Sequence, residues 1–424
     1  QLDPSGTSWV PAPFWAYGVA FRCFGAELGV ARATAIALSL AATVLVYVAA
    51  RVLGASKLGA LLGAAFSSLL LPYSAYLGIA ALPEVPCAAL MLFGAATLAR
   101  DGGALRAWGA LALLIGCLSR YEAWPIAGVF AGLNACDAVK QRRPALLGCA
   151  LLALAGPLAW LALGRIEHGQ ALFFVSRVTS YRRALGGNEV SLLRRILEYP
   201  VLLFAGAAEL SGLLLLVSTL TRRTTPEPLR YRRCALTLLG MLAFLILGSV
   251  RDGVPTHHAG RVLLPIWFLG CVIAGARSAT LATQMPMPAR AITGLAVLGW
   301  TWLMTPFAVP SNTWAHREAE LEVGTAAREL TSSALAIDTP DYGYCAVQAA
   351  FGSPAATSVL DDHDPRHPSL NPFSDAATLD RALETRHARF VVLTLEHAPL
   401  LAARCREQWR SARFALFACA PAAG

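Results

Sequence analysis

Glu84 is the first residue of this sequence whose type and position could do chemistry. It stands between Pro83 and Pro86 at the beginning of a long apolar stretch. Prolines free backbone groups that must be satisfied within protein or beside water, and a carboxylate in such a place is costly unless it has a partner. It could accept a hydrogen bond or a proton from a hydroxyl group. The alternative is an acid that only stabilises the start of a helix.

A second candidate group is the short segment SRYEAWP at residues 119–125. It places Arg120, Tyr121 and Glu122 in a gap of a few residues between two apolar stretches. A guanidinium suits a phosphate because its planar fork donates two hydrogen bonds to one oxyanion. The segment therefore predicts contact with a phosphate or a sugar, although Arg120 and Glu122 could instead only neutralise each other and hold the turn.

Two longer gaps, 165–198 and 251–261, are unusually rich in arginine, tyrosine and histidine. The candidate ligand-binding residues in them are Arg177, Tyr181, Arg182, His257, His258 and Arg261. An anionic headgroup at a membrane surface would explain such positive charge, as would pairing with nearby glutamates or with lipid phosphates. The adjacent histidines lack the spacing of a zinc motif, and no cysteine pair has CxxC spacing. We therefore expect neither a zinc site nor a dense disulfide framework. Dependence of the activity on a divalent metal stays open.

The elements that position these residues are transmembrane helices. Of the 424 residues, 56% are hydrophobic and 14% are charged, whereas an average soluble domain has roughly 25% charged residues. Apolar stretches near the ~20 residues needed to cross a bilayer recur along the chain. We expect about ten spans, at residues 33–50, 58–77, 82–99, 105–118, 123–135, 145–164, 199–220, 234–250, 262–281 and 289–309.

Alternate gaps between these spans are basic, which fixes an orientation. They contain Arg51 and Lys57, Arg100 and Arg106, Lys140 with Arg142 and Arg143, five arginines between 222 and 233, and Arg277 with Arg290. By the positive-inside rule these gaps are cytoplasmic. The other gaps, which hold the candidate residues, and both ends of the chain are then extracytoplasmic. The net charge of +9 reflects this arrangement and not binding of nucleic acid.

The two ends of the chain differ from its centre. Residues 1–32 predict an extracytoplasmic loop with an aromatic helix lying in the membrane interface, and residues 33–309 the all-α multi-span domain. Residues 310–424 predict a small α/β domain, because strand-like stretches at 334–338, 356–360 and 390–394 alternate with helical stretches at 313–331, after 341, at 376–385 and at 398–409. We expect a small parallel sheet without a nucleotide site, since GxGxxG and P-loop motifs are absent from the sequence.

The order of these features resembles the GT-C superfamily of membrane glycosyltransferases, which includes protein O-mannosyltransferases and lipid A aminoarabinose transferases. The resemblance rests on WVPAPFWAYGVAFRCFG at 9–25, Pro83-Glu84, SRYEAWP, the basic outer loop, HHAGRVLLP at 257–265 and the terminal α/β domain. It covers essentially the whole chain, with loose motifs.

The resemblance implies transfer of a sugar from a polyprenyl-phosphate donor to a hydroxyl of a glycan, lipid or protein, with inversion, on the outer face of a membrane such as the bacterial inner membrane. It also implies an acidic base in the first outer loop. Asp3 is the one carboxylate before Glu27; the base is either Asp3 or an upstream residue, with Glu84 in support. We expect a first span upstream of Gln1.

Two other functions compete with this one. A transporter or lipid flippase would also have many spans and an interfacial pocket, but it is expected to show paired halves and ionisable residues within helix centres. In the sequence the charges gather at the outer ends of the spans. A non-catalytic membrane subunit is the other alternative. The sugar, the acceptor and the oligomeric state are not encoded in any recognisable motif.

The basic gaps lead to a topological prediction. Reporter proteins fused at Arg142 and Arg232 should be cytoplasmic, and fusions at Asn188 and Gly424 should be extracytoplasmic, because arginine and lysine are retained on the inner side. Alkaline phosphatase and green fluorescent protein fusions measure this. A cytoplasmic Gly424 fusion would contradict the placement of every candidate site residue.

Overall fold

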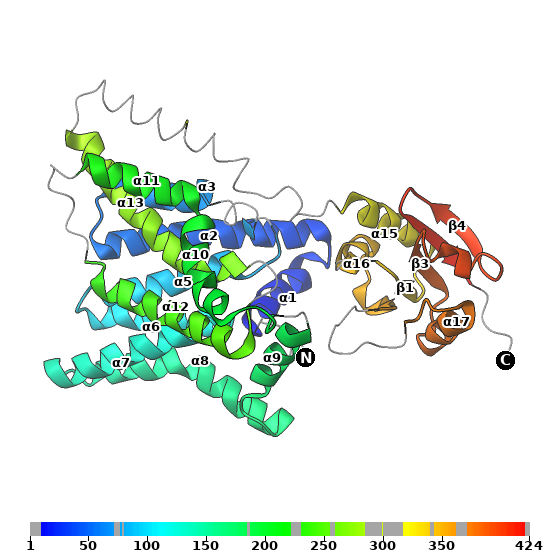
Figure 1. The fold of residues 1–424 in the computed structure, drawn as a ribbon, viewed down its shortest axis with the longest axis horizontal. Helices are drawn as coiled ribbons and strands as arrows, with labels where there is room; N and C mark the ends of the chain where they lie inside the picture. Colours follow the sequence, from blue (N-terminus) through cyan, green and yellow to red (C-terminus); the bar gives the residue numbers. More distant parts are fainter. Residues whose placement is uncertain are drawn as a thin grey trace. The chain divides into compact units, whose positions relative to one another are not determined.

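The chain forms two units in the computed structural model (Figure 1). The structure describes residues 10–71, 77–78, 80–184, 187–221, 230–254, 259–284, 299, 317–339, 343–361 and 371–419, except for the side chains of residues 177, 181 and 184. The membrane unit comprises Gln1–Tyr17 and Arg32–Pro310. The C-terminal unit comprises Gly18–Ala31 and Ser311–Gly424.

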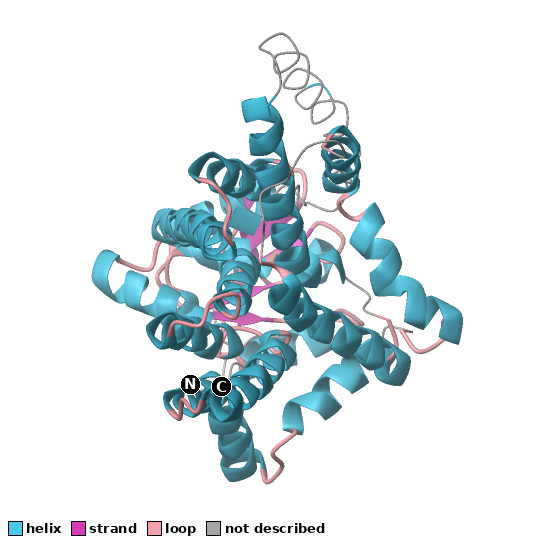
Figure 2. Ribbon diagram, turned by 90° about the vertical axis from the view of Figure 1, so that its left-hand side faces the viewer, coloured by secondary structure: helices cyan, strands magenta, loops and turns pink. Residues whose placement is uncertain are grey.

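Up to residue 284 the described chain is helical (Figure 2). The helices are α1 (Ala12–Phe24), α2 (Leu28–Leu53), α3 (Lys57–Leu69), α5 (Glu84–Thr97), α6 (Gly103–Cys117), α7 (Ala123–Gln141), α8 (Ala145–His168), α9 (Phe173–Ala184), α10 (Leu192–Ala205), α11 (Ala208–Leu220), α12 (Arg232–Asp252), the 3-10 helix η1 (Ala259–Leu263) and α13 (Leu264–Gln284). Helix α1 covers most of the aromatic segment predicted to lie in the interface; that position stays a prediction.

A helix lies at each of the first nine predicted spans, but their number as spans is not confirmed. By length and composition, α2, α8, α12 and the run 259–283 could each cross a membrane, and α10 with α11 could form one further, bent span. Helices α3, α5 and α6 are apolar but shorter. The tenth predicted span, 289–309, lies outside the described residues.

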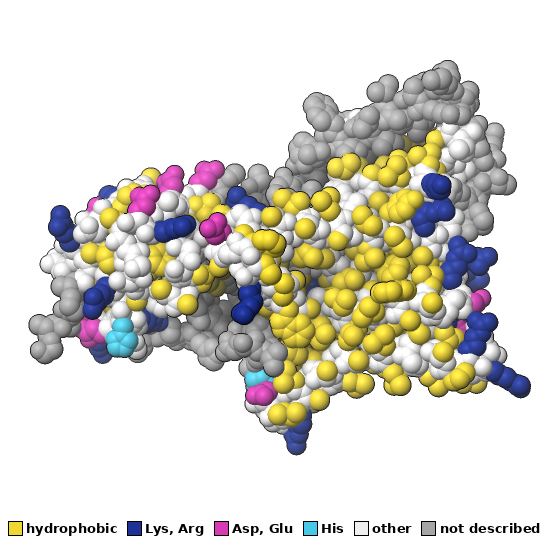
Figure 3. Space-filling view, turned by 180° about the vertical axis from the view of Figure 1, so that it is seen from behind, with side chains coloured by type: hydrophobic (Ala, Val, Ile, Leu, Met, Phe, Trp, Pro, Cys, Tyr) yellow, Lys and Arg dark blue, Asp and Glu magenta, His cyan; other side chains and the backbone are white. Residues whose placement is uncertain are grey.

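The outward surface of the membrane unit is apolar. Leu215 and Leu247 are 68% and 67% exposed, and hydrophobic side chains cover the face seen in Figure 3. Lysines and arginines gather at one end of this unit, at the right of that view. An apolar surface of this extent is the expected covering of a protein whose solvent is lipid.

Small residues allow the close packing of α3 on α13. A Cβ added to Gly275 would lie 2.3 Å from the backbone nitrogen of Gly63, and one added to Gly63 would lie 3.0 Å from Cα of Val272. Glycine at both positions therefore lets the two backbones touch. Such packing replaces the hydrophobic driving force, which is absent between helices in lipid.

Helices α10 and α11 meet at an angle of 64°. Pro200 lies inside α10, and Trp267 of α13 donates its indole N–H to the carbonyl of Leu203 at 2.9 Å. Glu209, in the first turn of α11, is buried beside the bend. The sequence-based statement that charges gather at the ends of spans is therefore wrong for Glu209, which lies within the predicted span 199–220.

The C-terminal unit contains one mixed sheet. Its strands are β1 (Leu335–Ile337), β2 (Thr357–Val359), β3 (Phe390–Thr394), β4 (Arg406–Arg410) and β5 (Phe414–Ala418), in the order β2-β1-β3-β5-β4. Strand β1 pairs in parallel with β2 and β3, whereas β5 pairs antiparallel with β3 and β4. Helices α15 (Glu318–Leu330), α16 (Tyr344–Phe351) and α17 (Ala376–Thr385) accompany it. The small terminal sheet is thus confirmed.

The helix predicted at 398–409 is wrong, and so is an all-parallel sheet. The 3-10 helix η3 (Ala398–Leu400) is followed by strand β4, which lies at the sheet edge and carries exposed charges at Arg406, Glu407 and Arg410. Charged residues on an edge strand prevent pairing with other chains, and they make such a strand look like a polar helix in sequence. Strand β5 was not predicted.

Asp338 joins the ends of β1 and β3. Its Oδ2 accepts hydrogen bonds from the backbone and hydroxyl of Thr394, at 3.2 and 2.9 Å, and lies 2.7 Å from Nδ1 of His397. Phe373 stacks on the imidazole of His397 with ring centroids 3.9 Å apart. The carboxylate is almost completely buried, and these partners compensate the loss of its water.

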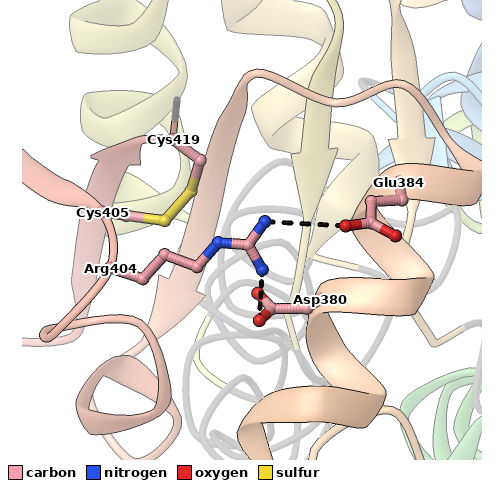
Figure 4. Close-up of a disulfide and its surroundings, with 5 residues drawn as sticks. All are labelled: Asp380, Glu384, Arg404, Cys405 and Cys419. Atoms are coloured by element: carbon pink, nitrogen blue, oxygen red, sulfur yellow. Dashed lines mark ion pairs between the residues drawn. A yellow bond between two sulfur atoms is a disulfide. The ribbon is translucent and has the colours of Figure 1, made fainter. Parts of the chain in front are cut away.

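A disulfide joins Cys405, just before β4, to Cys419, just after β5 (Figure 4). Beside it, Arg404 forms ion pairs with Asp380 and Glu384 of α17. The bond closes a loop with a sequence separation of 14 residues. Cross-linking a loop of this length stabilises a fold by about 3 kcal/mol, mainly through the entropy of the unfolded chain.

Removal of this disulfide should therefore lower the stability of the C-terminal unit. We expect the variant Cys405→Ser/Cys419→Ser to lose about 2–4 kcal/mol, measured as a lower midpoint of unfolding of the purified full chain. The control is Cys345→Ser, which removes an exposed free thiol of the same unit and should leave the midpoint unchanged. Equal midpoints for the double variant and the wild type would show that the bond does not form.

Candidate functional site

Glu84 is the first residue of α5, and its side chain is buried. Pro83 immediately precedes the helix, and Pro86 lies in the first turn, where a missing N–H costs no helical hydrogen bond. A carboxylate at this end of a helix is favoured by the helix dipole. Burial, however, requires further partners, and these come from other parts of the chain.

Arg120 is the main partner of Glu84. It lies in the turn between α6 and α7, and its Nη1 is 2.9 Å from Oε1 of Glu84, 36 residues away in sequence. The same guanidinium binds both carboxylate oxygens of Glu122, with Nε–Oε2 3.1 Å and Nη2–Oε1 2.8 Å. All three nitrogens of Arg120 therefore donate to carboxylates. This is the bidentate geometry in which arginine forms its strongest ion pairs.

Arg261 of η1 completes a cluster of four charged residues: Glu84, Arg120, Glu122 and Arg261. We call it the outer charged cluster, after the outer position that the sequence predicts for these residues. Its Nη1 lies 3.7 Å from Oε1 of Glu84. Oε2 of Glu84 is buried and accepts no hydrogen bond from any described residue. Two carboxylates and two guanidiniums make the cluster neutral, with one carboxylate oxygen left to receive a donor.

The carboxylates also stabilise the charged form of Arg120. Burial alone would lower the pKa of the guanidinium, but Glu122 and Glu84 outweigh it and raise that pKa above its usual value. Arg120 is therefore ionised at neutral pH, as a guanidinium normally is. Its hydrogen bonds join the start of α5 to the turn before α7, which makes it a positioning residue within the outer charged cluster.

Tyr121 lies in an aromatic group with Trp124, Trp160 and Phe174. Its ring stacks on Phe174 at 4.3 Å and meets Trp124 edge-on at 5.3 Å, while Trp160 donates its indole N–H to the tyrosine hydroxyl at 3.0 Å. These contacts join α7, α8 and α9. The tyrosine thus holds the turn that carries Arg120 and Glu122.

The N-terminal segment is attached to the same turn. The backbone N–H groups of Val10 and Ala12 donate to the carbonyls of Ser119 and Leu118, at 3.3 and 2.8 Å. Sequence reasoning did not identify this contact, because it joins segments more than a hundred residues apart. Asp3, the candidate base, precedes this segment and lies outside the described residues.

Arg182 of α9 binds backbone on another segment. Its Nη1 donates to the carbonyl of Gly253 at 3.1 Å, just after α12. Gly253 has φ +96°, and a Cβ there would meet the backbone of Gly187 at 2.4 Å, so glycine is required at this crossing. Arg177 and Tyr181 lie on the same helix, but their side chains are not described; His257 and His258 lie outside the described residues.

The structure therefore unites Glu84, Arg120, Glu122 and Arg261, while Tyr121 supports them and Arg182 makes a separate contact. Pairing of Arg120 with Glu84 was missed in the sequence, because only Glu122 is near enough in sequence to suggest a partner. Within the described residues, no group of three or more His, Cys, Asp or Glu side chains could hold a metal ion.

Comparisons with known proteins give matches in structure alone. No protein-family model matches the sequence, and no curated protein matches it. Among solved structures, ArnT from Cupriavidus metallidurans bound to undecaprenyl phosphate has a TM-score of 0.61 at 14% identity, over 97% of this chain and 88% of that chain. The apo state of the same protein has a TM-score of 0.57 at 14% identity, over 97% and 87%.

The pairing of Arg120 predicts a large effect on stability. Arg120→Met should destabilise the protein by about 3–5 kcal/mol, because Glu84 and Glu122 would lose the guanidinium that forms their closest ion pairs. The same change in a Glu84→Gln/Glu122→Gln background should cost much less. Unfolding of the purified variants in detergent gives this double-mutant cycle, and additive effects would contradict the pairing.

Proposed function

This chain has the fold of the GT-C membrane glycosyltransferases, and we propose that it transfers a sugar from a polyprenyl-phosphate donor to an acceptor hydroxyl, with inversion at the anomeric carbon. The reaction takes place on the outer face of the membrane. The observation that carries the proposal is the outer charged cluster, which lies at one end of an apolar helical unit in a fold that ArnT also has.

The physical requirements of the reaction match the composition of this end of the unit. A polyprenyl tail dissolves in the bilayer, so its phosphate meets the protein at the membrane boundary, where a buried carboxylate and guanidinium are already held in place. Departure of the phosphate requires positive charge, and attack by the hydroxyl requires a base. Donors fixed before the reaction stabilise developing charge without reorganisation.

We assign distinct roles to the members of the cluster. Arg120 positions Glu84 and Glu122, because its three donor nitrogens are all engaged. Glu84 receives a hydroxyl of sugar or acceptor at Oε2. Arg261 binds the donor phosphate, and since the cluster is neutral, further positive charge comes from Arg177, Arg182, His257 and His258. The base is Asp3 or an acid upstream of it.

The disulfide supports the proposed orientation. Structural disulfides form in oxidising compartments and are rare in the cytoplasm, so the Cys405–Cys419 bond favours an extracytoplasmic C-terminal unit. The basic residues at one end of the membrane unit favour a cytoplasmic position for that end. Both observations agree with a donor site on the outer side, in a membrane such as the bacterial inner membrane.

One observation favours a transporter as the second candidate. Buried Glu209 lies beside the 64° bend between α10 and α11, and bent helices with an ionisable residue at mid-membrane are typical of transporters. The two functions differ in their product. A transferase releases polyprenyl phosphate from its donor, whereas a transporter leaves the donor intact.

Release of undecaprenyl phosphate therefore tests the proposal, whichever sugar is transferred. Purified protein, a panel of undecaprenyl-phosphate sugars and a membrane extract as acceptor source should give release that requires both donor and extract. Glu84→Gln should lower the rate, and loss of the base itself should lower it by about 10²–10⁴-fold. Arg183→Ala, an exposed arginine on α9, is the control and should leave the rate unchanged.

The carboxylate variants also locate the base. If Asp3 is the base, Asp3→Asn should be more damaging than Glu84→Gln; if the base lies upstream, Asp3→Asn should be nearly silent. Full release of undecaprenyl phosphate by a chain carrying both changes would contradict the carboxylate mechanism. Donor that crosses the bilayer unchanged would instead support the transporter.

A further inference from the structure

A second group of charges lies at the opposite end of the membrane unit. Asp137, near the end of α7, pairs with Arg106 of α6, with Nη1–Oδ2 2.7 Å, and with Arg233 of α12, with Nη2–Oδ1 3.1 Å. Arg106 is fully buried and also lies 3.5 Å from Asp101. Both acids at this place are therefore already paired with Arg106, and Asp137 is also paired with Arg233.

A cavity of about 600 Å³ opens beside this network. Its walls come from the segment between α5 and α6 and from the start of α12 with the residues just before it. They are Leu98, Ala99, Asp101, Arg230, Arg232 and Arg233. The volume is in the range of ligand pockets, but the cavity is open to its surroundings, and Arg230 and Arg232 are both exposed. Leu98 and Ala99 are apolar, three of the other residues carry guanidinium groups, and Asp101 contributes a carboxylate.

Arg230 and Arg232 are not compensated by acid. Among the described residues, neither side chain forms an ion pair or a hydrogen bond, whereas Arg233 is held by Asp137. Asp101 also lines the cavity, and its carboxylate lies 3.5 Å from Nη2 of Arg106. Two guanidiniums thus face the cavity together with one carboxylate that another arginine already pairs. Orientation by the positive-inside rule explains basic residues at this end, but it does not explain why two of them line a cavity.

The surroundings of this cavity are of the kind found at a membrane boundary. Tyr231, between the two arginines, is exposed, and tyrosines are enriched at the level of lipid headgroups. Leu98 and Ala99 offer an apolar wall on which the glycerol and upper acyl chain of a lipid could lie. Basic pockets between helices on the cytoplasmic side are the places where anionic headgroups bind.

We infer that this cavity binds the phosphate headgroup of an anionic phospholipid of the inner leaflet. The phosphate accepts hydrogen bonds from Arg230 and Arg232, and the lipid joins the start of α12 to the ends of α5 and α6. A ligand that binds the folded state alone stabilises it by mass action. The inference is independent of the transferase function, since it uses other residues at the other end of the unit.

Native mass spectrometry of the purified full chain tests this site. The probes are dioleoyl phosphatidylglycerol, dioleoyl phosphatidylcholine and inorganic phosphate. Arg230→Gln/Arg232→Gln should weaken phosphatidylglycerol binding by about tenfold or more, because each change removes a charge-assisted hydrogen bond. Binding of phosphatidylcholine should be weak throughout, and Arg230→Lys/Arg232→Lys should keep part of the affinity for phosphatidylglycerol.

The matched control is Lys57→Gln/Lys140→Gln. It removes two exposed positive charges from the same end of the unit, outside the cavity, and should change binding by less than about twofold. Every variant keeps the outer charged cluster, so failure of the proposed transferase would not alter the result. Equal elution in size-exclusion chromatography confirms that each variant is folded.

Three results would overturn the inference. If the control loses as much affinity for phosphatidylglycerol as Arg230→Gln/Arg232→Gln does, only net charge matters. Equal binding by the wild type and Arg230→Gln/Arg232→Gln would show that the cavity is not the site. If inorganic phosphate binds in a way that depends on Arg230 and Arg232, and phosphatidylglycerol does not bind, the ligand is a soluble phosphate and not a lipid.

Discussion

The cost of unpaired charge in an apolar medium determines where the ionised groups of this protein lie. Helices α5, α6 and α7 run alternately, so Glu84, Arg120 and Glu122 meet at one end and Arg106, Asp137 and Asp101 at the other. Between these ends the surface of the unit is apolar. Because Glu84, Arg106 and Asp137 take partners from other helices or turns, the pairs that satisfy these charges also join the helices to one another.

The two ends of the membrane unit differ in their balance of charge. At the outer charged cluster, acids and bases are equal in number, and Oε2 of Glu84 accepts no hydrogen bond from any described residue. At the other end, bases exceed acids, and two arginines face a cavity. A neutral, preorganised cluster suits a site where charge develops during a reaction, because the groups need not move. A cavity with surplus positive charge suits a bound anion.

Much of the fold could be predicted from the sequence, because apolar stretches and helix or strand periodicity are local. Helix α17 and strand β3 lie at the predicted residues, 376–385 and 390–394. The bend between α10 and α11 was not predicted. Strand β4 was predicted as a helix, because an edge strand with exposed charges lacks the alternation of apolar residues that marks a buried strand. The disulfide was missed because spacing alone does not select Cys405 and Cys419 among ten cysteines.

The candidate site was predictable in its residue types and not in its pairings. Glu84, Arg120 and Arg261 could each be identified by charge beside an apolar stretch, but their meeting depends on how α5, the turn before α7 and η1 pack. The sequence therefore suggested phosphate binding by Arg120, whereas the geometry favours a positioning role, since all its bonds are to carboxylates. Long-range packing of this kind has no short-range signal.

The most direct test of the central claim is a cryo-electron microscopy map of the full chain in nanodiscs with added undecaprenyl phosphate. We expect density for the phosphate beside Arg261, within hydrogen-bonding distance of its guanidinium, and the prenyl chain along the apolar helices. Undecaprenyl phosphate bound at the Arg106 end alone, or no bound prenyl chain at a concentration that saturates the protein, would contradict the account.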